Sequence, residues 1–198
     1  VCERERERER GREREGGGLA IVSSLLYVST NHIANGFSDK AKMYFDWELG
    51  IEIVPWMILV YISFYAILVL GFFACIDRET IKSYCYSMIL SSFIAAVVFI
   101  VFPGELGYGR AEDVGVFKPL YDWLYMMDKP VNMYPSLHIT SSMIAAYFIS
   151  DSTKKAWVRV GVWAWFIAIG FSVILVHQHH LFDVVTGLAL GLFVRRVV

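Results

Sequence analysis

The sequence predicts an all-α membrane protein, a bundle of six transmembrane helices. Of its 198 residues, 57% are hydrophobic, compared with about 45 to 50% in an average soluble domain. Six apolar runs carry few or no charges, and the longest suit helices that cross the ~30 Å hydrocarbon core of a bilayer. The runs show no alternation of period two, which excludes a transmembrane β-barrel.

The chain opens with a low-complexity run, Glu3 to Glu15, in which Glu and Arg alternate almost strictly. Such a run has no apolar face to pack, so we expect residues 1–18, which end in three glycines, to form a disordered or solvated tail. A role at the membrane surface or with a partner stays open, although the near-zero net charge argues against attraction to anionic lipid. Residues 19–198 are expected to form one membrane domain.

Two apolar runs are long enough to cross a membrane and hold no charge: Val54 to Ile76, with 23 residues, and Cys85 to Phe102, with 18. A third run, Ala156 to Val176, holds only Arg159 near its start, where a long side chain can reach the interface. Three shorter runs complete the predicted set: Leu19 to Ala34, Ser136 to Ser150 and Leu181 to Val194.

The distribution of Lys and Arg predicts the orientation in the membrane. Six spans place both termini on one side, and short connections rich in basic residues mark the cytoplasmic side. On the side of the termini, the connections and the C-terminus hold Arg78, Lys82, Lys154, Lys155, Arg159, Arg195 and Arg196. On the opposite side, the acids outnumber the five bases, which are Lys40, Lys42, Arg110, Lys118 and Lys129. We therefore expect cytoplasmic termini and long loops that face the periplasm, a lumen or the cell exterior.

Charge and cysteine content exclude two other classes of function. The formal net charge of −1 excludes a nucleic-acid binder that works by broad phosphate neutralisation. The three cysteines, Cys2, Cys75 and Cys85, cannot form a disulfide scaffold or a CxxC metal site.

The longest loop ends in a motif that contains candidate functional side chains, Tyr134-Pro135-Ser136-Leu137-His138. Because Pro135 can open a helix, Ser136 and His138 would lie in the first turn, where unpaired N–H groups and the helix dipole favour an anion. The string alone is also compatible with a capping Ser beside an interfacial His.

A second cluster, His177-Gln178-His179-His180-Leu181-Phe182-Asp183, joins the last two predicted spans. On a helix His179 and Asp183 are four residues apart, so the carboxylate can hold one ring nitrogen and leave the other as a nucleophile. Asn or Gln should be better tolerated at His177 and His180 than at His179. The alternatives are an ion pair that merely closes the turn, or a metal site formed by the three histidines, which no regular backbone brings to one face.

These motifs resemble those of the type 2 phosphatidic acid phosphatase superfamily of membrane lipid phosphatases and phosphotransferases. The string at 135–138 matches the family's Pro-Ser-Gly-His, with Leu137 in place of Gly. Ser172, His179 and Asp183 match the spacing of the family's last motif.

The sequence departs from the family pattern in its cations. Val173 replaces the arginine of the last motif, and Arg110-Ala111 is the only remnant of the first motif, without its lysine. This reduced pattern looks closest to the branch of inositol phosphosphingolipid and sphingomyelin synthase relatives, in which two His and one Asp suffice to recognise the site.

The resemblance implies a mechanism without metal or cofactor. His179, held by Asp183, would attack phosphorus to form a phosphohistidine, while His138 would protonate the leaving alcohol and then activate water or an acceptor alcohol. The candidate phosphate-binding residues are Arg110, Ser136, Ser172, Lys118 and Lys129. The implied partners are the bilayer, a lipid phosphate and an alcohol acceptor. A rival hypothesis is a non-catalytic module of the same fold that binds a phospholipid, suggested by the missing cations.

Overall fold

A computed structural model of the chain describes residues 18–19, 22–23, 25–34, 36–37, 39–127 and 131–198. Nearly all of the predicted Glu/Arg tail and one predicted site residue, Lys129, therefore lie outside the described residues. The described part of the chain is helical and contains no strand, which confirms the all-α prediction.

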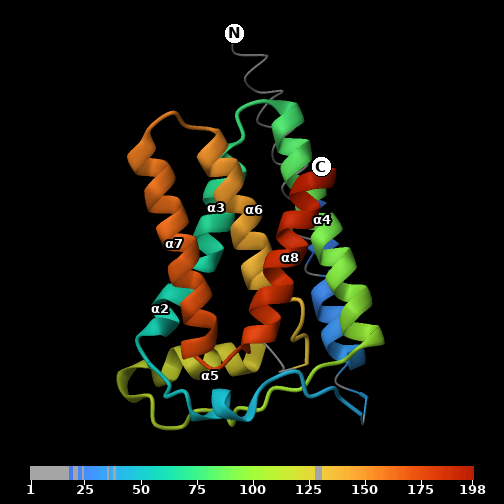
Figure 1. The fold of residues 1–198 in the computed structure, drawn as a ribbon, viewed down its shortest axis with the longest axis vertical. Helices are drawn as coiled ribbons and strands as arrows, with labels where there is room; N and C mark the ends of the chain where they lie inside the picture. Colours follow the sequence, from blue (N-terminus) through green and yellow to red (C-terminus); the bar gives the residue numbers. More distant parts are fainter. Residues whose placement is uncertain (1–17, 20–21, 24, 35, 38, 128–130) are drawn as a thin grey trace.

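The helices form a bundle in which they run roughly along the long axis of the molecule (Figure 1). Its members are α2 (Met57–Ile62), α3 (Phe64–Ala74), α4 (Arg78–Val101), α6 (Leu137–Asp151), α7 (Ala156–Leu175) and α8 (Leu181–Val197), together with the helical residues 25–34. The centre is α6, which packs against α3, α4, α7 and α8. Small residues permit this close packing: a Cβ on Gly71 of α3 would lie only 2.9 Å from the Cβ of Ala145 in α6.

Three stretches are long and apolar enough to cross a membrane: Met57–Ala74, which joins α2 and α3, then Arg78–Val101 and Ala156–Leu175. They correspond to the three strongest runs in the sequence. The helix α4 begins earlier than its apolar run because the Asp77 side chain accepts a hydrogen bond from the backbone N–H of Thr80 and so caps the helix. With 15 and 17 residues, α6 and α8 are shorter than the ~30 Å core, so six spans remain a prediction.

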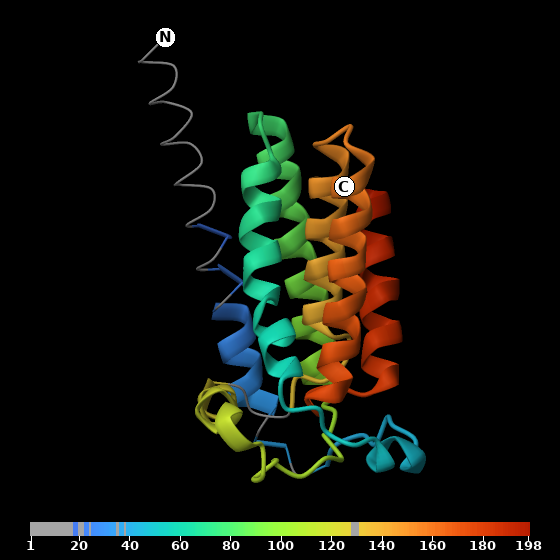
Figure 2. The same ribbon diagram turned by 90° about the vertical axis from the view of Figure 1, so that its left-hand side faces the viewer.

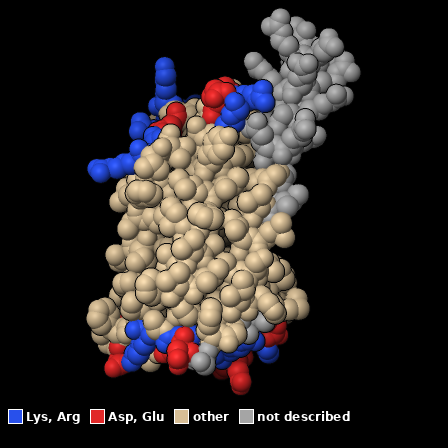
Figure 3. Space-filling view, turned by 90° about the vertical axis from the view of Figure 1, so that its right-hand side faces the viewer, with Lys and Arg blue, Asp and Glu red and all other residues tan. Residues whose placement is uncertain are grey.

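The surface of the bundle is divided into two charged ends and an uncharged belt between them (Figure 3). Large apolar side chains are exposed along the outer helices, among them Leu59, Val69, Phe73, Phe93, Val97, Val160, Ile167, Phe171, Val185 and Leu192. Exposed apolar surface on this scale is typical of a protein that lies in lipid. The surface of the protein thus supports integration into a membrane.

All the long loops lie at one end of the bundle, which we call the loop end (Figures 1 and 2). They include the short 3₁₀ helices η1 (Asp46–Gly50) and η2 (Gly115–Phe117), and the helix α5 (Lys118–Met127), which lies across the end of the bundle. A backbone bridge joins the two loops, since Ala41 N–H donates to the Pro103 carbonyl at 2.7 Å and Glu105 N–H donates to the Ala41 carbonyl at 3.2 Å. The opposite end, with the C-terminus, is called the tail end.

Candidate active site

Two elements meet at the loop end to form the candidate site: the N-terminus of α6 and the turn between α7 and α8. The backbone N–H of Ser136 donates to the carbonyl of Asp183 at 3.1 Å, and the Thr140 hydroxyl donates to the carbonyl of Gly187 at 2.9 Å. A side chain at Gly187 would clash with the helix, because its Cβ would lie 2.7 Å from the Ser136 carbonyl oxygen. These contacts fix α8 against the start of α6.

The two predicted catalytic histidines and the aspartate form one continuous chain of contacts. Nδ1 of His179 lies 3.2 Å from Oδ2 of Asp183, and Nε2 of His179 lies 3.3 Å from Nδ1 of His138. Since a carboxylate only accepts, Nδ1 of His179 carries the hydrogen. In the neutral ring, Nε2 of His179 therefore keeps its lone pair and points toward His138.

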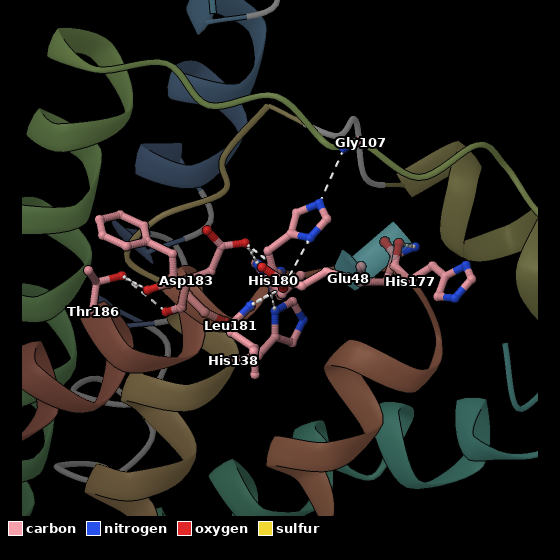
Figure 4. A network of polar contacts seen from close by, with 12 residues as sticks. Glu48, Gly107, His138, His177, His180, Leu181, Asp183 and Thr186 are labelled. Carbon is pink, nitrogen blue, oxygen red and sulfur yellow. Dashed lines mark hydrogen bonds and ion pairs between the residues drawn. The ribbon is translucent and has the colours of Figure 1, made fainter. Parts of the chain in front are cut away.

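Asp183 is well placed to orient His179 because it is itself fixed. Its side chain is almost fully buried, with 2% of its surface exposed, and the same Oδ2 accepts the backbone N–H of His180 at 2.9 Å. Asp183 is the third residue of α8, where a carboxylate also interacts favourably with the helix dipole. Figure 4 shows this side chain facing the turn that carries the histidines.

The other nitrogen of His138 contacts a residue that the sequence analysis missed, Tyr61 of α2. The Tyr61 hydroxyl lies 2.8 Å from Nε2 of His138, and the rings of Tyr61 and Phe64 each lie 4.7 Å from the His138 ring. Because Tyr61 lies inside an apolar run, its polar atom was the only sequence signal, and nothing in the sequence indicated its partner.

His177 and His180 belong to a stack of four rings in the order Tyr44, His180, Tyr108 and His177. Adjacent ring centroids are 4.0 to 4.6 Å apart, with interplanar angles of 6 to 17°. The stack ties both long loops to the turn between α7 and α8. His177, just beyond the end of α7, has a φ of 57°, in the left-handed region that glycine usually occupies at this place. Its Nε2 lies 2.9 Å from the Ile51 carbonyl oxygen.

A buried carboxylate, Glu48, anchors the first loop to α8 and was also missed. Its two oxygens accept the backbone N–H groups of Phe45 at 2.9 Å and Leu181 at 2.8 Å, and Oε2 lies 3.4 Å from Nδ1 of His180. Glu48 is fully buried and is drawn beside His180 and Leu181 in Figure 4. The sequence holds no signal for this contact, because Leu181 lies 133 residues away.

Burial shapes the electrostatics of this stack. It lowers the pKa of His180, although Asp183 and Glu48 raise it in part, and it lowers the pKa of His177. Burial, together with the charge of Glu48, raises the pKa of Tyr108 to about 12. Burial also raises the pKa of Tyr44, so it favours the uncharged form of all four stacked rings.

The predicted phosphate-binding residues lie in two different places in the structure. The Ser136 hydroxyl is buried and has no hydrogen-bond partner among the described residues. The Ser172 hydroxyl donates within its own helix, to the Ile169 carbonyl at 2.7 Å. Arg110 instead faces α5, where it donates to the Tyr125 carbonyl at 3.2 Å, and Lys118 pairs with Asp122 at 2.6 Å. Both line an open pocket of about 310 Å³ beside α5.

The three histidines of the turn have three different partners, so they do not converge. His177 contacts the Ile51 carbonyl, His179 contacts Asp183, and His180 lies beside Glu48. Within the described ranges, no three His, Cys, Asp or Glu side chains are grouped so that they could hold a metal ion.

Part of the chain matches a known protein family. Residues 111–195 match the PAP2 superfamily. The matched segment contains Ser136, His138, Ser172, His179 and Asp183. The match supports the resemblance to the type 2 phosphatidic acid phosphatase superfamily, whose members are generally phosphatases or phosphoesterases. No curated protein matches the chain.

Proposed function

We propose that this protein is a membrane phosphatase or phosphotransferase that acts on a lipid phosphate through a phosphohistidine at His179. The observation that carries the proposal is the chain from His138 through His179 to Asp183, with distances of 3.3 and 3.2 Å. It supplies an oriented imidazole nucleophile and a second imidazole beside it, which are the two groups that such a reaction needs.

In the proposed first step, Nε2 of His179 attacks the substrate phosphorus. A nitrogen–phosphorus bond forms while the bond from phosphorus to the alcohol oxygen breaks, and protonated His138 gives its Nδ1 proton to that oxygen. Substrate enters between the two rings, replacing their direct contact. In the second step, His138 removes a proton from water or an acceptor alcohol, whose oxygen displaces His179 from phosphorus.

Charge on the phosphoryl oxygens must be stabilised during transfer. We assign this role to the unpartnered hydroxyl of Ser136 and to the N–H groups in the first turn of α6, where the helix dipole favours an anion. Arg110 can contribute by turning from Tyr125 toward the site. Ser172 and Lys118 already have other partners, and we assign them no direct contact.

The position of the site favours a substrate that is anchored in the membrane. The loop end lies beyond the apolar belt, where a phosphate headgroup meets water while its chains remain in lipid. Phosphatidate, a prenyl diphosphate and a phospholipid whose phosphate passes to another alcohol, as in the sphingolipid synthases, all meet this requirement.

We further propose that the loop end faces the periplasm, a lumen or the cell exterior. The basic residues of the connection between α6 and α7 and of the C-terminus lie at the tail end, which the positive-inside rule assigns to the cytoplasm. A C-terminal tag should be protected from protease in sealed, right-side-out cells. Digestion of the tag before lysis would reverse this orientation.

A binding module without catalysis is the second candidate function. It is favoured by Val173, which stands where the family has an arginine and is fully buried in the core. The two candidates differ at His179, because a binding module has no use for an oriented, neutral imidazole.

The purified protein should release phosphate from a lipid phosphate, or transfer it to an alcohol, in a panel assayed with and without alcohol acceptors. Activity should survive EDTA, and vanadate should inhibit because it mimics the five-coordinate phosphorus formed with His179. Phospholipid binding without turnover would favour the binding module. Loss of activity in EDTA, restored by Mg²⁺ or Zn²⁺, would contradict the metal-independent mechanism.

A further inference from the structure

We infer that Tyr61 is a positioning residue for His138, holding Nε2 so that the proton is exchanged only at Nδ1, the nitrogen that faces His179. This inference rests on the proposed function, in which His138 is the acid and then the base. Tyr61 lies in α2, outside the segment that matches the superfamily, and none of the recognised motifs includes it.

The contact has the geometry of a specific interaction. The hydroxyl oxygen of Tyr61 is 2.8 Å from Nε2 of His138, the ordinary distance for a hydrogen bond. Only 3% of Tyr61 is exposed, which keeps bulk water from competing for Nε2. Phe64 packs on the same imidazole and limits its rotation.

The backbone that carries Tyr61 is held from α7. The indole N–H of Trp165 donates to the Ser63 hydroxyl at 2.8 Å, and that hydroxyl donates to the Val60 carbonyl. The backbone N–H of Ser63 also donates to the Leu59 carbonyl at 3.1 Å. Tyr61 is therefore presented to His138 from a tethered turn, as a positioning residue requires.

The two nitrogens of His138 need different treatment during the reaction. When His138 is protonated, Nε2–H donates to the Tyr61 oxygen and Nδ1–H faces the leaving group. After the transfer, the other hydrogen stays on Nε2, which donates it to the Tyr61 oxygen. The lone pair is therefore on Nδ1, where the base is needed. A phenol hydroxyl can accept or donate, and it stays paired with Nε2 in each protonation state.

Tyr61 thus contacts the ring nitrogen of His138 that does not react, as Asp183 contacts the non-reacting nitrogen of His179. The difference in charge fits the two roles. A carboxylate favours a positive imidazole, which suits the nucleophile because bonding to phosphorus places positive charge on its ring. A neutral phenol stabilises the cation less, which suits an acid that must release its proton.

The test uses Tyr61→Phe, which keeps the ring and removes the hydroxyl, with two substrates. Phosphatidate has an alcohol leaving group that needs a proton, and 4-nitrophenyl phosphate has one that does not. In single-turnover measurements of the first step, which leave out the water-activation step that both substrates share, we expect release of the alcohol from phosphatidate to slow about 10- to 100-fold, part of the ~10²–10⁴ that acid–base catalysis contributes. Release of 4-nitrophenol should occur nearly as in wild type.

Tyr84→Phe is the matched control. It removes another buried phenol, which donates to the Leu68 carbonyl at 2.8 Å and packs on Phe72 and Phe148, and it should leave both rates near wild type. Equal losses on both substrates in Tyr61→Phe would mean a merely structural role and overturn the inference. The proposed function has a separate test, because it fails if His179→Asn retains turnover of phosphatidate.

A second measurement does not depend on turnover. In ¹⁵N spectra of histidine-labelled protein in detergent, the signals absent from His138→Asn are those of His138. Their Nε2 resonance should change to that of a nitrogen without a hydrogen bond in Tyr61→Phe, and stay unchanged in Tyr84→Phe. An unchanged Nε2 resonance in Tyr61→Phe would overturn the inference even if neither substrate were turned over.

Discussion

At each end of the bundle a carboxylate contacts a nitrogen-bearing side chain, but the contact at the tail end is exposed and the one between His179 and Asp183 at the loop end is buried. At the tail end Arg195 and Asp151 lie 2.7 Å apart, with 46% and 54% of their side chains exposed. At the loop end the side chains of His179 and Asp183 are only 6% and 2% exposed. Water competes with the first contact and is largely excluded from the second, so the two carboxylate contacts have different consequences.

The carboxylates at the two ends also differ in the backbone N–H groups that they accept. The buried Asp183 and Glu48 accept three backbone N–H groups between them, in addition to their histidine contacts. An exposed ion pair contributes about 0 to 1 kcal/mol, whereas a buried N–H left unpaired costs about 1 to 3 kcal/mol. The buried carboxylates of the loop end should therefore contribute more to the stability of the fold than the exposed Asp151 of the tail end.

The largest effect is expected for His179→Asn, which removes the proposed nucleophile. Turnover should fall by at least about 10³-fold, because the remaining groups can bind phosphate but cannot form the covalent intermediate. Arg195→Gln, which breaks the tail-end pair, is the control and should keep nearly full activity. Initial rates on a lipid phosphate would measure both. Similar losses in the two variants would remove the functional distinction between the ends.

Asp183→Asn should follow, with a loss of about 10²- to 10⁴-fold in kcat. The same Oδ2 contacts both His179 and the backbone N–H of His180. An NH₂ in its place forces the hydrogen of His179 onto Nε2, the wrong tautomer for attack, and an amide oxygen in its place lacks the charge that stabilises a positive ring. Asp122→Asn changes an exposed aspartate with the same spacing, four residues after Lys118, and should have little effect. Rate assays in which Asp183→Asn is as active as Asp122→Asn would contradict the assigned tautomer.

Glu48→Gln should destabilise the fold by about 2 kcal/mol, because the new NH₂ group faces a backbone N–H that has lost its acceptor. For a chain of this size, this corresponds to a fall of about 4 to 8 °C in Tm. Asp151→Asn at the tail end should change Tm by only a degree or two. Thermal unfolding in detergent is the measurement, and equal shifts would show that burial does not distinguish the two carboxylates.

The smallest effect concerns pH. Folding lowers the pKa of His177 and His180, so the unfolded chain binds protons more readily than the folded one. The contribution of these residues to the free energy of unfolding is complete above the ordinary pKa of about 6.5. It is lost as the pH falls through the lowered pKa values. His180→Gln should flatten this decline in Tm, and His32→Gln, at an exposed histidine outside the stack, should not. A decline that His180→Gln leaves unchanged would assign the effect to other groups.

The sequence predicted most of what depends on local pattern. The three long apolar runs became the three candidate spans, and the spacing of His179 and Asp183 placed them in contact. Contacts between distant segments could not be read in this way, because Glu48 meets Leu181 and Tyr61 meets His138 only after the bundle has formed. His180 was expected to be a replaceable neighbour, but it is buried between Tyr44 and Tyr108, so we now expect its replacement to affect stability.

Detection of phosphate on His179 tests the central proposal most directly. The protein, and its His138→Asn variant in which the second step should be slow, would be mixed with ³²P-labelled 4-nitrophenyl phosphate and quenched in alkali. The account predicts label that survives alkali, is lost in acid as expected for a phosphorus–nitrogen bond, and maps to the peptide containing His179. Turnover with no label on that peptide, or label that is stable in acid, would contradict it.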